Sequence, residues 1–335
     1  MVVTATIRRL QRGTWRMDNS MRMQRVFFLV VAASLALAAC GGAQDGGADS
    51  GGEPVAAAGD ATPAVADGSA ALRCPPPVRT DLAGPDIIGI RTGMTADEAL
   101  ATARCALGED AEVKAGNRWL DRLETYGVEL GTQTFTVRKG DHRPCNFQRE
   151  WQECEGGLKW GHVDEIVTVA TPGAPGKETA LGVWRTQTFR EGEMPPVQAL
   201  LDALVSKYGP PQITENSDAP RGYSAGSRDM EWVFDRAGNP LAEANPMFGQ
   251  CRGAVHAHKG DTNARWRDGC GFSIRTRVLL SGKNPGLAME VSSAMLHQGD
   301  LFAQVEAMQA ELQQLGQARR DAEVQQAGEA SDVRL

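Results

Sequence analysis

The chain has no hydrophobic run of the roughly 20 residues that a membrane-spanning helix needs. The apolar stretch of its leader covers residues 26–39, which is 14 residues, and the core of a signal peptide has about 7–15. Six arginines precede this stretch: Arg8, Arg9, Arg12, Arg16, Arg22 and Arg25. The pattern therefore predicts a cleaved signal peptide at residues 1–39 rather than a spanning anchor.

Strong catalytic motifs are also scarce. The sequence has no His-Glu-x-x-His pair for zinc and no phosphate-binding glycine loop. The adjacent carboxylates Asp97-Glu98 and Asp164-Glu165 point apart on a helix or a strand. His142, His162 and His297 are isolated in the sequence. These features favour a protein that binds its partner without catalysis and without a cofactor.

The chain beyond the leader has no surplus of basic residues. The whole chain carries a net charge of −7 and residues 1–39 carry +5, so the remainder carries −12. Phosphates of nucleic acids and of anionic lipid headgroups repel such an acidic protein. We therefore expect no nucleic-acid partner.

The leader ends with Leu37-Ala38-Ala39-Cys40, and Gly41-Gly42 follows. These four residues resemble a bacterial lipobox, in which the cysteine is lipidated and becomes the first mature residue. The alternatives are an ordinary signal peptide, or an uncleaved anchor, with a coincidental cysteine. A start at Met21 or Met23 would give the basic segment its usual length, and we expect translation to begin there.

The lipobox resemblance implies a location for the protein. Cys40 would carry a diacylglycerol and an N-acyl chain such as palmitate, and several chains hold a protein stably on a membrane. Gly41 stands where inner-membrane lipoproteins usually have aspartate, so we expect the outer membrane, facing the periplasm. Residues 40–72 are rich in Gly, Ala, Asp, Ser and Pro, which predicts a flexible tether of roughly 30 Å reach.

Six further cysteines follow the tether, an even number that indicates disulfides in an exported protein. They are Cys74, Cys105, Cys145, Cys154, Cys251 and Cys270. Several pairings are possible. Sequential pairing closes short loops without threading, so we favour Cys74–Cys105, Cys145–Cys154 and Cys251–Cys270, each contributing about 2–4 kcal/mol.

Hydrophobic spacing predicts three helices. Thr95 and Glu98 form a capping-box pattern before a helix that Gly108 ends. A second helix enters at Pro195-Pro196, ends at Gly209, and has one apolar face: Val197, Leu200, Leu201, Leu204, Val205 and Tyr208. A third is expected to be capped by Asp300, with its stripe at Leu301, Val305, Met308, Leu312 and Leu315. Residues 317–335 should form a polar, fraying tail.

Strands are predicted after each of the first two helices. Alternating apolar residues mark strands near Phe135, at 163–170, near Trp232 and at 272–280, and Asn284-Pro285-Gly286 turns the last one into a hairpin. We therefore predict an α+β fold of two modules, residues 73–188 and 189–316. Each module has a helix and an antiparallel sheet, disulfides staple them, and an amphipathic helix closes the chain.

Part of the chain resembles a lipoprotein family. Residues 89–99 are similar to the opening of BamE/OmlA-type modules, in which a Gly-Met-Thr/Ser turn starts a helix packed on a sheet. Residues 207–211 look like the helix exit of a second module, and Trp232 and Gly238 fit its first hairpin. Tandem modules of this kind also resemble the β-lactamase-inhibitory-protein fold, a binding scaffold. The resemblance implies a fold and a non-catalytic role, and it assigns no site residues.

The segment between Cys251 and Cys270 has the sharpest constellation of side chains. His256 and His258 share one face of a strand, so Cys-His-His-Cys is a possible zinc site. In an oxidising compartment we favour a disulfide-closed loop and no metal. The loop is also basic and aromatic, as binding anchors often are, and its candidate partner-binding residues are Arg252, Lys259, Arg265, Trp266 and Arg267. A solvated hairpin loop is the plain alternative.

Taken together, these patterns favour an envelope lipoprotein with a non-catalytic binding or assembly role. Its expected partners are the membrane, through the lipid, and an envelope protein or a cell-wall component. Two alternatives stay open: an exported enzyme, such as a hydrolase of envelope polymers, and a sensor for a small ligand or a metal.

Overall fold

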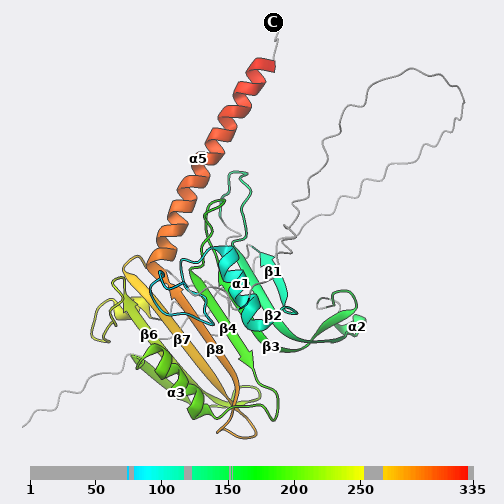
Figure 1. Ribbon diagram of the computed structural model, residues 1–335, viewed down its shortest axis with the longest axis vertical. Coiled ribbons are helices and arrows are strands. Elements are labelled where there is room, and N and C mark those ends of the chain that lie inside the picture. Colours follow the sequence, from blue (N-terminus) through cyan, green and yellow to red (C-terminus); the bar gives the residue numbers. More distant parts are fainter. Residues whose placement is uncertain are drawn as a thin grey trace, which may run out of the picture. The chain divides into compact units, whose positions relative to one another are not determined.

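The computed structural model describes residue 74 and residues 79–116, 123–150, 152, 154–252 and 267–330, which all belong to one compact unit, residues 66–335. Their strands form one antiparallel sheet in the order β1-β2-β3-β4-β8-β7-β6-β5. Helices α1 and α3 lie across one face of this sheet, and α5 projects from its end (Figure 1). The predicted α+β class is confirmed, and the two expected modules share a single sheet.

The elements have the following bounds. The strands are β1 (Glu112–Gly116), β2 (Thr134–Pro144), β3 (Leu158–Ala170), β4 (Gly182–Thr188), β5 (Ile213–Ser217), β6 (Ser224–Asp235), β7 (Cys270–Ser281) and β8 (Ala288–His297). The helices are α1 (Ala96–Leu107), α2 (Phe147–Glu150), α3 (Val197–Tyr208), α4 (Phe248–Cys251) and α5 (Gln298–Ala330).

Helix α1 begins at the predicted capping box. The Glu98 N–H donates to the Thr95 hydroxyl (3.2 Å), and the Thr95 N–H donates to the Glu98 carboxylate (2.9 Å). These bonds satisfy two backbone donors that the first helical turn leaves free. The helix buries four residues: Ala99, Thr102, Ala103 and Leu107.

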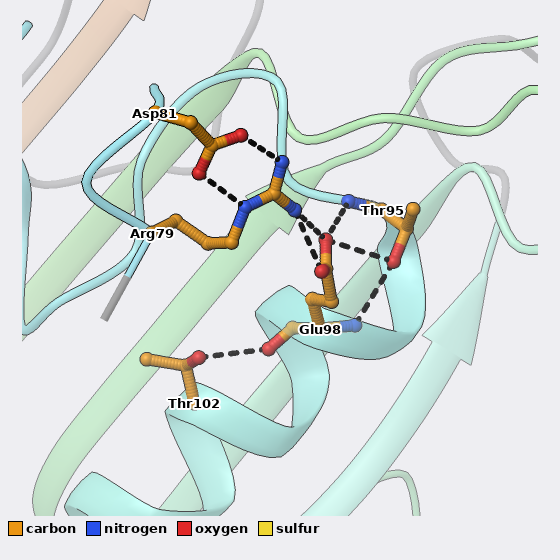
Figure 2. A network of polar contacts seen from close by, with 5 residues as sticks. All are labelled: Arg79, Asp81, Thr95, Glu98 and Thr102. Carbon is orange, nitrogen blue, oxygen red and sulfur yellow. Dashed lines mark hydrogen bonds and ion pairs between the residues drawn. The ribbon is translucent and has the colours of Figure 1, made fainter. Parts of the chain in front are cut away.

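The segment before α1, residues 79–94, is called the strap below. Arg79 fastens its start, because the guanidinium binds the carboxylates of Glu98 (2.6 and 2.7 Å) and Asp81 (2.7 and 2.8 Å), as Figure 2 shows. The Arg79 hydrogen bond lowers the pKa of Asp81 to about 2. The pKa of Glu98 is lowered mainly by the hydrogen bond from the Thr95 N–H and, to a smaller extent, by the hydrogen bond from Arg79. The capping box therefore also anchors the strap.

The middle of the strap lies on the second half of the sheet. Ile87 and Ile90 are buried in one core cluster with Trp232, Ile274 and Met295. The strap also meets the end of α3, where the Tyr208 hydroxyl donates to the Asp86 carbonyl (3.0 Å) and Lys207 binds the Asp86 carboxylate (3.0 Å). Gly84 has φ 91° and lies against the Phe272 ring so closely that a Cβ would clash. The strap thus fills the space between α1 and α3 over β7.

The two halves of the sheet are related by an approximate two-fold axis. Helices α1 and α3 have 12 residues each, and each ends at a glycine whose N–H bonds a carbonyl four residues earlier. Matching bridges join Thr95 to Thr179 and Pro196 to Leu287, which makes Ala180 equivalent to Ala288 and Arg185 equivalent to Ser293. Since Arg185 and Ser293 pair with each other across β4 and β8, the axis passes between them.

Helix α5 differs from its prediction at both ends. It begins at Gln298, and Asp300 does not cap it: the Asp300 N–H donates to Nδ1 of His297 (3.1 Å). The helix also continues to Ala330, where the sequence predicted a fraying tail from residue 317. Local pairs support this extension, including Arg319–Glu323 (3.4 Å) and Gln317–Asp321 (2.7 Å). Its buried apolar side chains, Leu301, Met308 and Leu312, belong to the predicted stripe.

The favoured disulfide pairing is confirmed. Bonds join Cys74 to Cys105, Cys145 to Cys154 and Cys251 to Cys270. The second closes the β2–β3 connection and the third closes the β6–β7 connection, which are equivalent positions under the two-fold relation. Cys251 and Cys270 are fully buried, in a small cluster with Val233, Leu241 and Phe248.

Candidate binding surface

The face of the sheet opposite α1 and α3 is called the helix-free face. Strand alternation places two kinds of side chain on its central part. The charged residues are Glu215, Asp229, Glu231, Arg275 and Arg277, and the hydroxyl residues are Thr136, Thr168, Thr186 and Ser292. The start of α5 covers one end of this face, where Leu301 and Val305 pack on Trp184 and Ala294.

The charges of the helix-free face form a ladder across β5, β6 and β7. Arg277 binds Asp229 (2.7 Å), and Arg275 lies 3.7 Å from Asp229 and 3.3 Å from Glu231. Arg252 donates hydrogen bonds to Glu231 (2.9 Å) and Glu215. Both bonds raise the pKa of Arg252, and the bond to Glu231 has the larger effect. The Asp229 and Glu231 side chains are only 8% and 5% exposed. Each of these two buried carboxylates has two arginine partners, so the ladder holds the face in one arrangement.

The hydroxyl residues lie on the same helix-free face, next to the charge ladder, on β2, β3, β4 and β8. Thr136 bonds Thr168 (3.1 Å), and Thr186 bonds Ser292 (3.1 Å), whose hydroxyl donates to Glu290 (2.9 Å). Each hydroxyl has acceptor capacity beyond these bonds. Thr136, Thr168 and Thr186 are half-buried, so a partner could reach them. The face therefore offers neutral hydrogen-bonding groups beside a row of paired charges.

The structure places the predicted partner-binding residues unequally. Arg252 is half-buried and belongs to the charge ladder, whereas Arg267 is exposed and its carbonyl accepts from the Cys270 N–H (3.1 Å). Lys259, Arg265 and Trp266 lie outside the described residues, as do the weak metal candidates His256 and His258. Cys40 and the tether also lie outside them.

A hydrolase-like sequence occurs at residues 222–226, where Gly-Tyr-Ser-Ala-Gly fits the Gly-x-Ser-x-Gly pattern. In a nucleophile elbow this serine stands exposed between a strand and a helix. Ser224 instead begins strand β6 after a turn and is 5% exposed. Its hydroxyl donates to the Gly226 carbonyl (2.6 Å) and accepts from the Gly226 N–H (3.1 Å). This serine therefore closes a turn and does not have the setting of a nucleophile.

The three predicted isolated histidines lie in different parts of the structure. His142 stacks on Trp160 with 4.0 Å between ring centres, and His162 lies 3.3 Å from Asp164. His297 caps α5, and burial lowers its pKa. Among the described residues there is no group of three or more His, Cys, Asp or Glu side chains that could hold a metal ion.

A cavity of about 620 Å³ lies between α5 and the segment that starts at Leu123. Its lining includes two carboxylates, those of Glu124 and Glu306. Glu124 accepts a hydrogen bond from the Tyr126 N–H (3.0 Å), which gives it a role in the local turn. The other lining residues are Leu123, Tyr126, Gln309, Ala310 and Gln313.

The charge ladder could have been found in part from sequence. Between the apolar residues of the predicted strand at 272–280 stand Arg275 and Arg277, so the second face of this strand had to be charged. Their acidic partners could not be identified, because Asp229 and Glu231 reach them only through the register of β6 against β7.

Of the helices in the described ranges, none combines the length and the apolar character that crossing a membrane would require. No protein-family model, curated protein or solved structure matches the chain.

Proposed function

We propose that the protein is an envelope lipoprotein, anchored through Cys40, that binds a protein or a cell-wall component on the helix-free face of its sheet. The observation that carries the proposal is this face itself. The charges of its ladder are neutralised by one another, the hydroxyl residues Thr136, Thr168 and Thr186 are within reach of solvent, and helices α1 and α3 cover the opposite side. A rigid surface of this kind loses little conformational entropy when a partner binds.

The location rests on two independent features. The leader and Leu37-Ala38-Ala39-Cys40 support export and lipidation, and three disulfides support an oxidising compartment. The outer membrane is the destination that Gly41 supports. A hydrolase and a small-ligand or metal sensor are the competing functions.

Crosslinking in intact envelopes tests the binding role. Thr168→Arg places a bulky charge in the middle of the helix-free face, whereas the control Ala322→Arg makes the same change in charge at an exposed position of α5. We expect one protein or cell-wall component to be recovered with the wild type and with Ala322→Arg, and to be lost with Thr168→Arg. Unchanged thermal melting of both variants would show that folding is intact.

The proposal fails if the Thr168→Arg variant recovers the same partner as the wild type. It also fails if no partner is recovered and the purified protein turns over a cell-wall polymer, which would establish the hydrolase alternative.

A further inference from the structure

The two-fold relation exposes a difference between the halves on the helix side of the sheet. In the second half, Trp232, Ile274 and Met295 are neighbours on β6, β7 and β8, and all are buried in the core cluster that includes Ile87 and Ile90 of the strap. The equivalent residues of β2, β3 and β4 are Lys139, Glu165 and Gln187. A buried apolar row in one half thus corresponds to a polar row in the other.

This polar row, together with Arg185 at the two-fold axis, is called the polar strip. The side chains of Lys139, Arg185 and Glu165 are 45%, 29% and 16% exposed, and Gln187 is half-buried. Arg185 donates from Nε to Glu165 (2.6 Å) and from Nη2 to Gln187 (3.1 Å), which leaves Nη1 without a partner among the described residues. The strip is therefore ordered and still accessible.

No segment of the described chain lies over the polar strip as the strap lies over its counterpart. The strap precedes α1, whereas α3 follows β4 after a connection of only residues 189–196. The burial of equivalent residues on α1 and α3 also differs between the two halves. Thr102 of α1 is 6% exposed and faces Gly89 of the strap, but its equivalent on α3, Ala203, is exposed, and α3 has no fully buried residue.

We propose that the polar strip and the adjoining face of α3 form a second docking surface, which takes an extended acidic segment of a partner protein. The segment would lie between α1 and α3 as the strap does in the equivalent position. Arg185 is paired with Glu165 (2.6 Å), whereas Lys139 lies 4.0 Å from Asp110, whose side chain is largely exposed, so Lys139 is the cation of the strip that an acidic occupant could reach. This surface is on the opposite side of the sheet from the helix-free face, so it is independent of the function proposed above.

The strap supplies the reason for an acidic occupant. Its Asp86 lies at the end of α3 beside Tyr208, whose ring is 5.3 Å from Trp232. Lys139 is equivalent to Trp232, and its ammonium donates to the Leu107 carbonyl at the end of α1 (2.8 Å). The Asp86 carboxylate binds Lys207 near the end of α3 (3.0 Å), and in the other half Lys139 supplies the cation at the end of the helix. We therefore expect an acidic residue of the occupant to lie near the Lys139 ammonium.

A designed peptide tests this surface on the full-length, disulfide-bonded protein. The probe is a peptide with the sequence of strap residues 82–90, in which Ile87→Thr, Ile88→Thr and Ile90→Thr replace apolar side chains that would otherwise face the polar strip. The control probe carries the same changes and also Asp86→Lys. Binding is followed by fluorescence anisotropy. We expect the acidic probe to bind about tenfold more tightly than its lysine counterpart, the size expected for one well-placed charge.

Two protein variants locate the binding site. Gln187→Glu adds a negative charge to the polar strip and should weaken the acidic probe about tenfold while strengthening the lysine probe. Gln314→Glu makes the same change at an exposed position of α5 and should alter neither affinity. The proposal is overturned if the acidic probe does not bind the wild type, if both probes bind equally, or if Gln187→Glu behaves like Gln314→Glu.

Discussion

At the scale of single residues, the start of α1 has two tasks. Glu98 completes the capping box and also receives Arg79, so one carboxylate joins the helix to the strap. The pKa values of Asp81 and Glu98 are lowered in the folded protein. Their stabilising effect is therefore present above the unfolded pKa of about 4. It is lost as the pH falls through the folded values, because the unfolded state then binds more protons.

Arg79→Gln should remove much of this pH dependence. We expect the variant to melt a few degrees below the wild type at pH 7 and to lose less stability than the wild type between pH 5 and pH 2. Arg320→Gln, on the exposed part of α5, is the matched control. Thermal melts over this pH range measure the effect, and parallel curves for wild type and Arg79→Gln would contradict it.

Residue patterns within one element were predictable from sequence. Thr95, Glu98 and Gly108 act through bonds only a few residues long, so their pattern places both ends of α1 correctly. Asp300 was assigned wrongly as a cap, because His297, a strand residue, supplies the accepting nitrogen. Residues 222–226 fit the nucleophile-elbow pattern, and only the structure shows that Ser224 starts a strand.

At the scale of elements, long amphipathic segments could be predicted and short edge strands could not. The alternation in residues 272–280 marks β7, which is buried on one side. Strands β1 and β5 have five residues each and few buried side chains, so they carry no comparable signal. The pairing of β4 with β8, which joins the halves, follows from tertiary packing over more than 100 residues of chain.

Helix α5 offers a clean test at this scale. Leu312 is fully buried in a cluster with Ala174 and Met308, whereas Leu315, almost one turn later, is 41% exposed. Leu312→Ala should reduce the free energy of unfolding by about 2–5 kcal/mol, because it leaves a cavity. Leu315→Ala should cost less than about 1 kcal/mol. Equal losses in denaturant titrations would mean that α5 does not pack on the body through this stripe.

At the scale of the whole molecule, an internally repeated sheet has two unequal halves. The strap covers one half, and the other keeps a polar strip at the equivalent place. Neither half resembles the other closely in sequence at this position, since Lys139, Glu165 and Gln187 replace Trp232, Ile274 and Met295. For this reason the repeat and the polar strip become visible only through the strand registers.

The expected anchor is also tested on the whole molecule. Cys40→Ser should abolish incorporation of labelled palmitate and move the protein from the membrane fraction to the soluble fraction of the envelope. Cys145→Ser with Cys154→Ser, which removes a disulfide but leaves the leader intact, should stay membrane-bound. Palmitate labelling of the Cys40→Ser variant would contradict lipidation at this residue.

The bond between Cys74 and Cys105 has a mechanical consequence. It joins the chain ahead of the strap directly to the last turn of α1. A pulling force applied to the chain ahead of Cys74 would pass through this bond into α1 and bypass the residues between the two cysteines. The Arg79 contacts and the capping box would then bear no load while the disulfide is intact. Under reducing conditions the same force would act on Arg79 first, and the strap would peel from the sheet.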